Sequence, residues 1–119
     1  MVVKASIKKS RFFKRYVEII NVLFNLSNRE MDVLALLIEL DYYWHNTKFK
    51  NILDTSSRKY IMKETYVNKS NLSRYIATFK EKGILAPVED GWEINKKVVP
   101  VIKDNSLVIT FNLDIKDEE

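Results

Sequence analysis

The sequence predicts an α+β domain in which helices come first and short strands follow. Apolar residues recur at helical spacing through most of residues 11–82, whereas residues 84–115 consist of short apolar runs separated by turn residues. The pattern changes at Gly83, and glycine is typical of the position just beyond the end of a helix. With 119 residues, one domain with a single hydrophobic core is expected.

Two long helices are expected in the first part of the chain. Residues 11–25 fit the first, because apolar side chains recur every three or four positions. The second should run from about Asn28 to Trp44, since Ser27 and Glu30 form a capping box that satisfies free N–H groups at a helix start. This second helix is apolar on two faces, which predicts a place at the centre of the core or in one half of a dimer seam.

A polar loop over residues 45–57 leads into a short helix over residues 56–67 and then a further helix from Ser70 to Lys82. Ser70 is the expected N-cap of this last helix. Its inward face is expected to hold Leu72, Tyr75, Ile76 and Phe79, which follow i, i+3, i+4, i+7 spacing.

Two hairpins are expected in the last third of the chain. Asp90 and Gly91 predict a tight turn between two short runs. A second hairpin would join residues 98–102 to residues 106–115, which alternate between apolar and polar and so need a cover on one face. The favoured interpretation is that this hairpin extends the sheet and covers the core, and the alternative is strand addition to another chain at an open edge.

Charge is distributed unevenly along the chain. The net charge of +4 mildly favours a polyanionic partner. Residues 2–8 fit a short strand or an extended arm, and residues 114–119 hold four acids and one lysine, so contacts are expected at both ends. Residues 1–15 contain basic side chains and no acid: Lys4, Lys8, Lys9, Arg11, Lys14 and Arg15.

The composition argues against enzymatic chemistry. There are no cysteines for disulfides or thiolate metal sites, and two glycines are too few for a phosphate-binding loop. The one histidine, His45, follows an aromatic run and is expected at a helix end or on the surface. The sequence therefore predicts no catalytic residue, metal, cofactor or small-molecule substrate. It also has no apolar run of about 18 residues, so no membrane contact is expected, and the absence of cysteine favours the cytoplasm or a virion.

The order of helix, helix, short helix, turn, capped helix and hairpin resembles the winged-helix family of helix-turn-helix domains. The resemblance covers residues 12–97 and depends on "REMDVLALLIEL", "RKYIMKETYVNKSNLSRYIATFKEKGIL" and "VEDGWEI". Residues 68–85 look like the recognition helix and first wing strand of MarR-like regulators and of phage or plasmid replication proteins. The chain would then divide into a basic arm (1–10), a winged-helix domain (11–97) and a C-terminal hairpin extension with an acidic tail (98–119).

The resemblance implies that polar side chains at the start of the helix after the turn face the major groove. Asn can pair with adenine, Arg can fork onto guanine, and Ser and Lys can hold phosphates. The implied DNA-binding residues are Asn68, Lys69, Ser70, Asn71, Ser73 and Arg74, with Lys8, Lys9 and Arg11 added by the basic arm. The hairpin departs from the family pattern, because acids surround its tip where basic residues are usual: Glu89, Asp90 and Glu93.

The expected function is therefore that of a non-enzymatic winged-helix protein that binds double-stranded DNA, as a regulator or a replication accessory. It would be dimeric through its first helix and its two-faced second helix. The alternative is a structural adaptor subunit of a large assembly, such as a phage virion or head–tail connector, which would use the winged helix for protein–protein contacts. In both cases further copies or other subunits would contact the N-terminal arm and the C-terminal strand.

Overall fold

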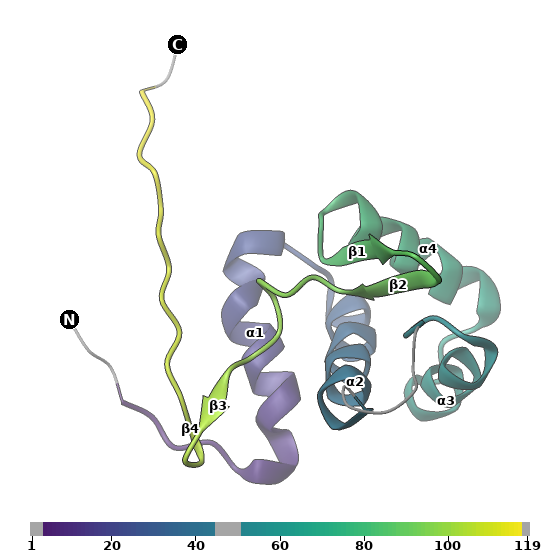
Figure 1. Cartoon of the computed structure of the whole chain (residues 1–119), viewed down its shortest axis with the longest axis horizontal. Helices are drawn as coiled ribbons and strands as arrows, with labels where there is room; N and C mark the ends of the chain where they lie inside the picture. Colours follow the sequence, from purple (N-terminus) through teal and green to yellow (C-terminus); the bar gives the residue numbers. More distant parts are fainter. Residues whose placement is uncertain (1–3, 45–50, 118–119) are drawn as a thin grey trace.

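The computed structural model describes residues 4–44 and 51–117, with Lys9 and Trp44 described by their backbone only. This part of the chain contains four α-helices and two small antiparallel hairpins, which confirms the expected α+β class (Figure 1). The elements are a short 3-10 turn (Lys9–Arg11), α1 (Phe12–Phe24), α2 (Asn28–Trp44), α3 (Thr55–Thr65), α4 (Lys69–Glu81), β1 (Leu85–Val88), β2 (Gly91–Ile94), β3 (Ile102–Lys103) and β4 (Ser106–Leu107). In the described residues no helix is both long enough and apolar enough to cross a membrane.

The first two helices end and begin at locally encoded signals. Helix α1 ends at Asn25, which adopts a left-handed φ of 54°. The predicted capping box then opens α2: the Ser27 N–H donates to Glu30 Oε1 at 2.9 Å, and the Glu30 N–H donates to Ser27 Oγ at 3.3 Å. These reciprocal bonds satisfy two N–H groups that the helix itself leaves free. The expected bounds of both helices are therefore confirmed to within a residue.

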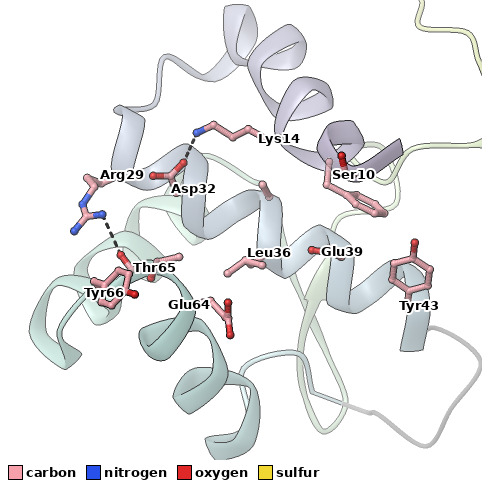
Figure 2. A pocket seen from close by; sticks show the side chains of 12 residues that line it. Ser10, Lys14, Arg29, Asp32, Leu36, Glu39, Tyr43, Glu64, Thr65 and Tyr66 are labelled. Atoms are coloured by element: carbon pink, nitrogen blue, oxygen red, sulfur yellow. Dashed lines mark hydrogen bonds and ion pairs between the residues drawn. The ribbon is translucent and has the colours of Figure 1, made fainter. Parts of the chain in front are cut away.

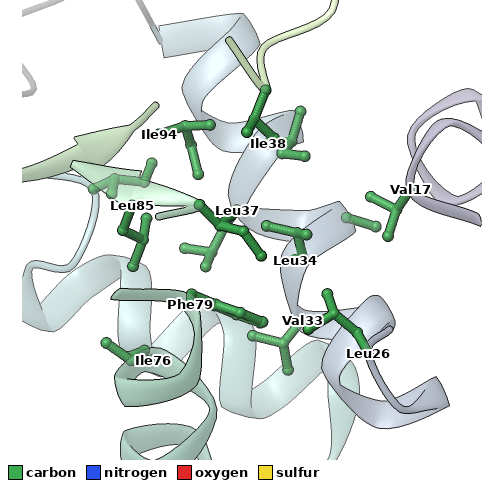
Figure 3. Close-up of a cluster of buried hydrophobic side chains, with 14 of the residues drawn as sticks. Val17, Leu26, Val33, Leu34, Leu37, Ile38, Ile76, Phe79, Leu85 and Ile94 are labelled. Atoms are coloured by element: carbon green, nitrogen blue, oxygen red, sulfur yellow. The ribbon is translucent and has the colours of Figure 1, made fainter. Parts of the chain in front are cut away.

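Helix α2 lies at the centre of the molecule, as its two apolar faces predicted. It contacts α1, α3, α4 and β2. Val33, Leu34, Leu37 and Ile38 are fully buried along it, and Phe79 of α4 packs into the same cluster (Figure 3). Because α2 touches each of the other layers, it fixes the position of α3 and α4 relative to α1.

The start of α4 differs from the prediction. Asn68, not Ser70, is the N-cap, and its Oδ1 accepts a hydrogen bond of 2.8 Å from the Asn71 N–H. Asn68 has the extended backbone of a capping residue, which aims its side chain at the N–H three residues later. Helix α3 begins at Thr55, inside the predicted loop over residues 45–57. Asp54 is its N-cap and accepts a hydrogen bond of 2.7 Å from the Ser57 N–H.

Helix α4 ends as Gly83 predicted. Gly83 has a φ of 74°, and its N–H donates to the Lys80 carbonyl at 3.2 Å. The Ile84 N–H donates to the Phe79 carbonyl at 2.9 Å, which completes a Schellman motif. The motif reverses the chain and leads directly into β1.

The β1–β2 hairpin is present, but its turn lies one residue before the expected Asp-Gly pair. Val88 pairs with Gly91, so Glu89 and Asp90 form the two-residue turn and Gly91 begins β2. Gly91 has a φ of 150°, and a Cβ built there would lie 2.5 Å from Asn51 Cγ. Both the positive φ and the close approach of the Asn51 side chain therefore favour glycine at this position.

The second hairpin is much shorter than predicted. Its turn is confirmed, since Asp104 and Asn105 have the positive φ values of 52° and 59° that a type I′ turn needs. The expectation that it extends the sheet is wrong, because β3 pairs only with β4 in a separate two-stranded sheet. Figure 1 shows β3 and β4 beside the start of α1, away from β1 and β2, so no neighbouring strand continues the ladder past Leu107.

Both ends of the described chain leave the body without regular structure. Residues 4–8 form no helix or strand, which fits the arm and not the strand interpretation of this region. Residues 108–117, predicted as most of a long strand, also form none and extend away from β4 (Figure 1). Leu107 and Ile109 still pack against the core, so the covering role holds only for the first residues of this segment.

Candidate nucleic-acid interface

Helix α4 separates its apolar and polar side chains cleanly. Leu72, Ile76 and Phe79 are buried, and Tyr75 is half-buried. The face directed to solvent begins at the start of the helix and includes Lys69, Ser70, Ser73, Arg74 and Ala77. The structure therefore places five of the six implied α4 residues on the exposed surface, with Asn71 at the margin.

Arg74 is held by its neighbours while remaining exposed. Its Nη2 donates to Asn71 Oδ1 at 2.9 Å, and its Cζ lies 5.8 Å from the centre of the Tyr75 ring. A guanidinium has five N–H donors, so most of them stay available to an outside acceptor. Asn71 in turn keeps its amide N–H₂ for such an acceptor.

Asn68 has a structural task that limits its other uses. Its Oδ1 is occupied by the helix cap, so the amide nitrogen is the atom that can reach outward. Paired recognition of an adenine uses both atoms of an asparagine amide. Asn71 Oδ1 likewise accepts from Arg74, so Arg74, with free N–H donors, is the residue best placed to read a base edge.

Part of the exposed face of α4 consists of small side chains. Ser70, Ser73 and Ala77 follow one another at helical spacing and have small side chains. Small side chains allow a helix backbone to approach another surface closely, and hydroxyl groups can bond phosphate oxygens. Lys69, beside them, has no hydrogen bond or ion pair within residues 4–44 and 51–117.

Two further lysines of this region are used within the protein. The Lys80 ammonium lies 4.2 Å from the centre of the Trp92 ring, which joins α4 to β2. The Lys82 ammonium donates to the Phe24 carbonyl at the end of α1. Lys69 and Arg74 are thus the cations that α4 presents to solvent.

The tip of the β1–β2 hairpin is acidic, as the sequence showed. Glu89 and Asp90 are exposed in the turn, and Glu93 is half-buried on β2. Carboxylates close to a phosphate backbone lower affinity. The hairpin tip does not add positive charge to the α4 surface.

The basic arm lies apart from α4. Lys8 and Arg11 are exposed, and Figure 1 shows the arm leaving the start of α1 on the opposite side of the molecule from α3 and α4. The structure does not bring these residues together with Asn71 or Arg74. The Lys9 side chain and His45 lie outside the described residues.

Exposed tyrosines near α4 were missed by the sequence reasoning. Tyr66 ends α3 with a left-handed φ of 58° and is 88% exposed in the short turn before α4. Tyr60, on α3, is also exposed. Both residues fall within the predicted helix over residues 56–67, and only the observed end of α3 at Thr65 shows that Tyr66 lies outside it.

A groove of about 710 Å³ lies between α1, α2 and α3 (Figure 2). An ion pair between Lys14 and Asp32 crosses it, and Arg29 Nη1 donates to the Thr65 carbonyl at 3.0 Å. Glu39 and Glu64 add negative charge to its wall. Within the described ranges, no three His, Cys, Asp or Glu side chains are grouped so as to hold a metal ion.

Comparison with known proteins identifies no relative: no protein-family model, curated protein or solved structure matches this chain.

Proposed function

We propose that this chain is a non-enzymatic, double-stranded DNA-binding protein of the winged-helix type, in which α3 and α4 form the helix-turn-helix and β1–β2 forms the wing. The order of elements supports this assignment. So does the short turn over residues 66–68, which joins α3 to α4, and the Schellman motif that leads from α4 straight into β1. A regulator or a replication accessory would use such a domain without catalysing a reaction.

The observation on which the proposal depends is the exposed Asn71–Arg74 pair on α4. In the proposed complex the first two turns of α4 enter the major groove, where Arg74 and Asn71 meet base edges. Ser70, Ser73 and Lys69 bond phosphate oxygens and set the register of the helix. The exposed ring of Tyr66 would lie against the backbone beside the groove.

The acidic wing is directed away from phosphates in this arrangement. With Glu89 and Asp90 at its tip, close contact with the backbone would oppose binding. The basic arm, on the far side of the molecule, would contribute only if a second site or a second copy presents it to the same duplex.

Fluorescence anisotropy tests the proposal with labelled duplexes of random and of A·T-rich sequence. Binding at low salt is expected, with an observed association constant that falls steeply as salt rises, because each phosphate contact releases counterions. A chain that changes the anisotropy of no duplex at about 50 mM salt would contradict the proposal. Folding of the same sample is checked by circular dichroism.

A second candidate function is a structural adaptor in a large assembly. The acidic hairpin tip and the exposed apolar residues of 108–115 favour it, because both suit protein contacts better than DNA. This function predicts that removal of residues 1–10 or 106–119 abolishes assembly, while Lys69→Ala and Arg74→Ala have no effect. The opposite result, with both substitutions harmful and both truncations harmless, would exclude it.

A further inference from the structure

Helix α1 presents an apolar face to solvent. Val22 is 74% exposed, Leu23 is 52% exposed and Ile19 is 41% exposed, although all three belong to a helix that buries Tyr16, Val17 and Ile20 on its other side. Exposed apolar residues at i, i+3 and i+4 form a continuous strip along a helix. We name Ile19, Val22 and Leu23 the α1 strip.

Basic side chains continue the same face of α1 toward its start. Arg15, Ile19 and Val22 are spaced by four and three residues, so they lie within one sector of α1, and Arg11 is the N-cap residue just before the helix. Arg15 shares its charge with Glu18 at 3.2 Å, whereas the Arg11 side chain has no partner within the described part of the chain. The positive end of the helix dipole adds to these charges. This face is therefore apolar at one end and attractive to anions at the other.

Residues 108–117 have the complementary order. Apolar side chains come first and are exposed, with Phe111 at 39%, Leu113 at 68% and Ile115 at 99%. Asp114 lies between Leu113 and Ile115, and Asp117 and two further acids follow in the sequence. No residue of 108–117 makes a hydrogen bond or ion pair with the described chain, and after Ile109, which packs against the core, the side chains are exposed.

The edges of β1 and β2 in the same chain offer residues 108–117 few free backbone groups for strand pairing. The Asn95 N–H donates to the Ile84 carbonyl, and hydrogen-bonded and non-bonded pairs alternate along an antiparallel ladder. The backbone groups of Leu85 and Pro87 therefore point away from β2, toward the open edge of β1. Pro87 has no N–H to give to an added strand. On β2, the outer edge is already occupied, because the Ile52 N–H donates to the Trp92 carbonyl at 3.1 Å.

The chain direction of residues 108–117 indicates whether they would pair better with the α1 of their own chain or with the α1 of another copy. In Figure 1 residues 108–117 run the same way as α1, so the acidic end of the segment is directed toward the end of that helix. The negative end of the helix dipole lies there, and no basic residue occupies the last turn. A two-fold axis perpendicular to α1 reverses the direction for a second copy and brings the acidic end of the segment to Arg11.

We propose that the chain forms a two-fold dimer in which residues 108–117 of each copy lie antiparallel along the outer face of the other copy's α1. Phe111 and Leu113 cover the α1 strip, and Asp117, which lies on the same side of the extended segment, meets Arg11. The lengths agree: an extended chain from Phe111 to Asp117 spans about 20 Å, and a helix from Arg11 to Val22 spans about 17 Å. This proposal stands independently of DNA binding.

Disulfide trapping tests the contact directly, since the chain has no cysteine of its own. Val22→Cys protein is mixed with tagged Leu113→Cys protein and oxidised mildly. A disulfide between the two proteins is expected, in clear excess over the same mixture made with Val101→Cys, an equally exposed apolar position outside residues 108–117. A yield equal to that of the Val101→Cys control would overturn the proposal, as would a Val22→Cys, Leu113→Cys double variant that closes its disulfide within one chain.

Sedimentation equilibrium tests the energetics on the full chain. The unmodified protein should dimerise below about 100 μM, and Asp117→Lys should weaken the dimer by about tenfold. Adding Arg11→Glu should restore much of that loss, because it exchanges the two charges. A monomer at every concentration, or a dimer that Phe111→Ser with Leu113→Ser does not weaken, would overturn the proposal. Circular dichroism confirms that each variant is folded.

Discussion

The Arg74 guanidinium donates a hydrogen bond of 2.9 Å to the Asn71 side-chain oxygen on the exposed side of α4. The bond positions a cation that no acid of the described chain neutralises by an ion pair. A surface arginine fixed in this way, with donors to spare, is suited to an acceptor outside the protein.

Replacing Arg74 with alanine should weaken binding to duplex DNA by about 1–3 kcal/mol, which is about 5-fold to 150-fold. The reason is that both the forked donor and its charge are lost. Anisotropy titrations at constant salt measure the effect, with Lys103→Ala as the control, since it removes one exposed charge from the distant β3–β4 hairpin. Equal losses for the two variants would show that only net charge matters.

The cap of α4 provides a second prediction. Asn68→Ala should lower the free energy of unfolding by about 1 kcal/mol and the Tm by about 4 °C, because the Asn71 N–H loses its acceptor. Ser70→Ala should change stability little, since Ser70 lies inside the first turn and makes no cap. Thermal unfolding by circular dichroism measures both. A larger effect at Ser70 than at Asn68 would contradict the observed cap.

Replacement by alanine should change stability by different amounts at the two glycines. Both have a positive φ, which costs a residue with a Cβ about 1–2 kcal/mol. At Gly83 no atom lies within 4 Å of the added Cβ, whereas at Gly91 Asn51 Cγ lies only 2.5 Å away. Gly91→Ala should therefore destabilise the protein more than Gly83→Ala in urea unfolding. Similar midpoints for the two variants would mean that the Asn51 side chain moves aside without cost.

Tyr16 ties α1 to the chain that follows β2. Its hydroxyl donates to the Val98 carbonyl in the interior, so Tyr16→Phe should cost about 1–3 kcal/mol by leaving that acceptor unpaired. Urea unfolding at neutral pH measures this loss. An unchanged midpoint would show that water replaces the hydroxyl.

The same residue predicts a pH dependence. Burial raises the pKa of Tyr16 above its ordinary value of 10.0. In alkaline solution the unfolded chain therefore releases this proton before the folded chain does, and stability falls as pH rises from 10.0 toward the folded pKa. The difference in stability between the unmodified protein and Tyr16→Phe should then shrink as the pH rises above 10.0. A constant difference would contradict the raised pKa.

Local signals explain why much of the helical part was predictable. The Ser27–Glu30 capping box and Gly83 act through atoms a few residues apart, so their effect does not depend on the rest of the fold. The central place of α2 also followed from its own two apolar faces. On α4, the spacing of Leu72, Ile76 and Phe79 was enough to predict which residues point outward.

Where two residues could serve the same local role, the sequence did not predict which of them the structure uses. Asn68 and Ser70 can both cap a helix, and the structure uses Asn68, two residues after the left-handed residue that ends α3. The side chain of Asn51, 40 residues away from Gly91, lies against the start of β2 and accepts a hydrogen bond from the Trp92 N–H, a contact that no local pattern predicts. The apolar alternation in residues 107–115 predicts a strand, but a strand needs a neighbour, and none reaches past Leu107.

The sequence by itself determined the α+β class, the limits of α1 and α2, the end of α4 and the polar character of its outer face, because these depend on periodicity and on caps within one helical turn. Only the tertiary structure decided that the basic arm lies on the far side from Arg74 and that residues 108–117 stay unpaired. Both outcomes depend on which surfaces α2 brings together, and contacts between segments distant in sequence leave no periodic signal along the chain.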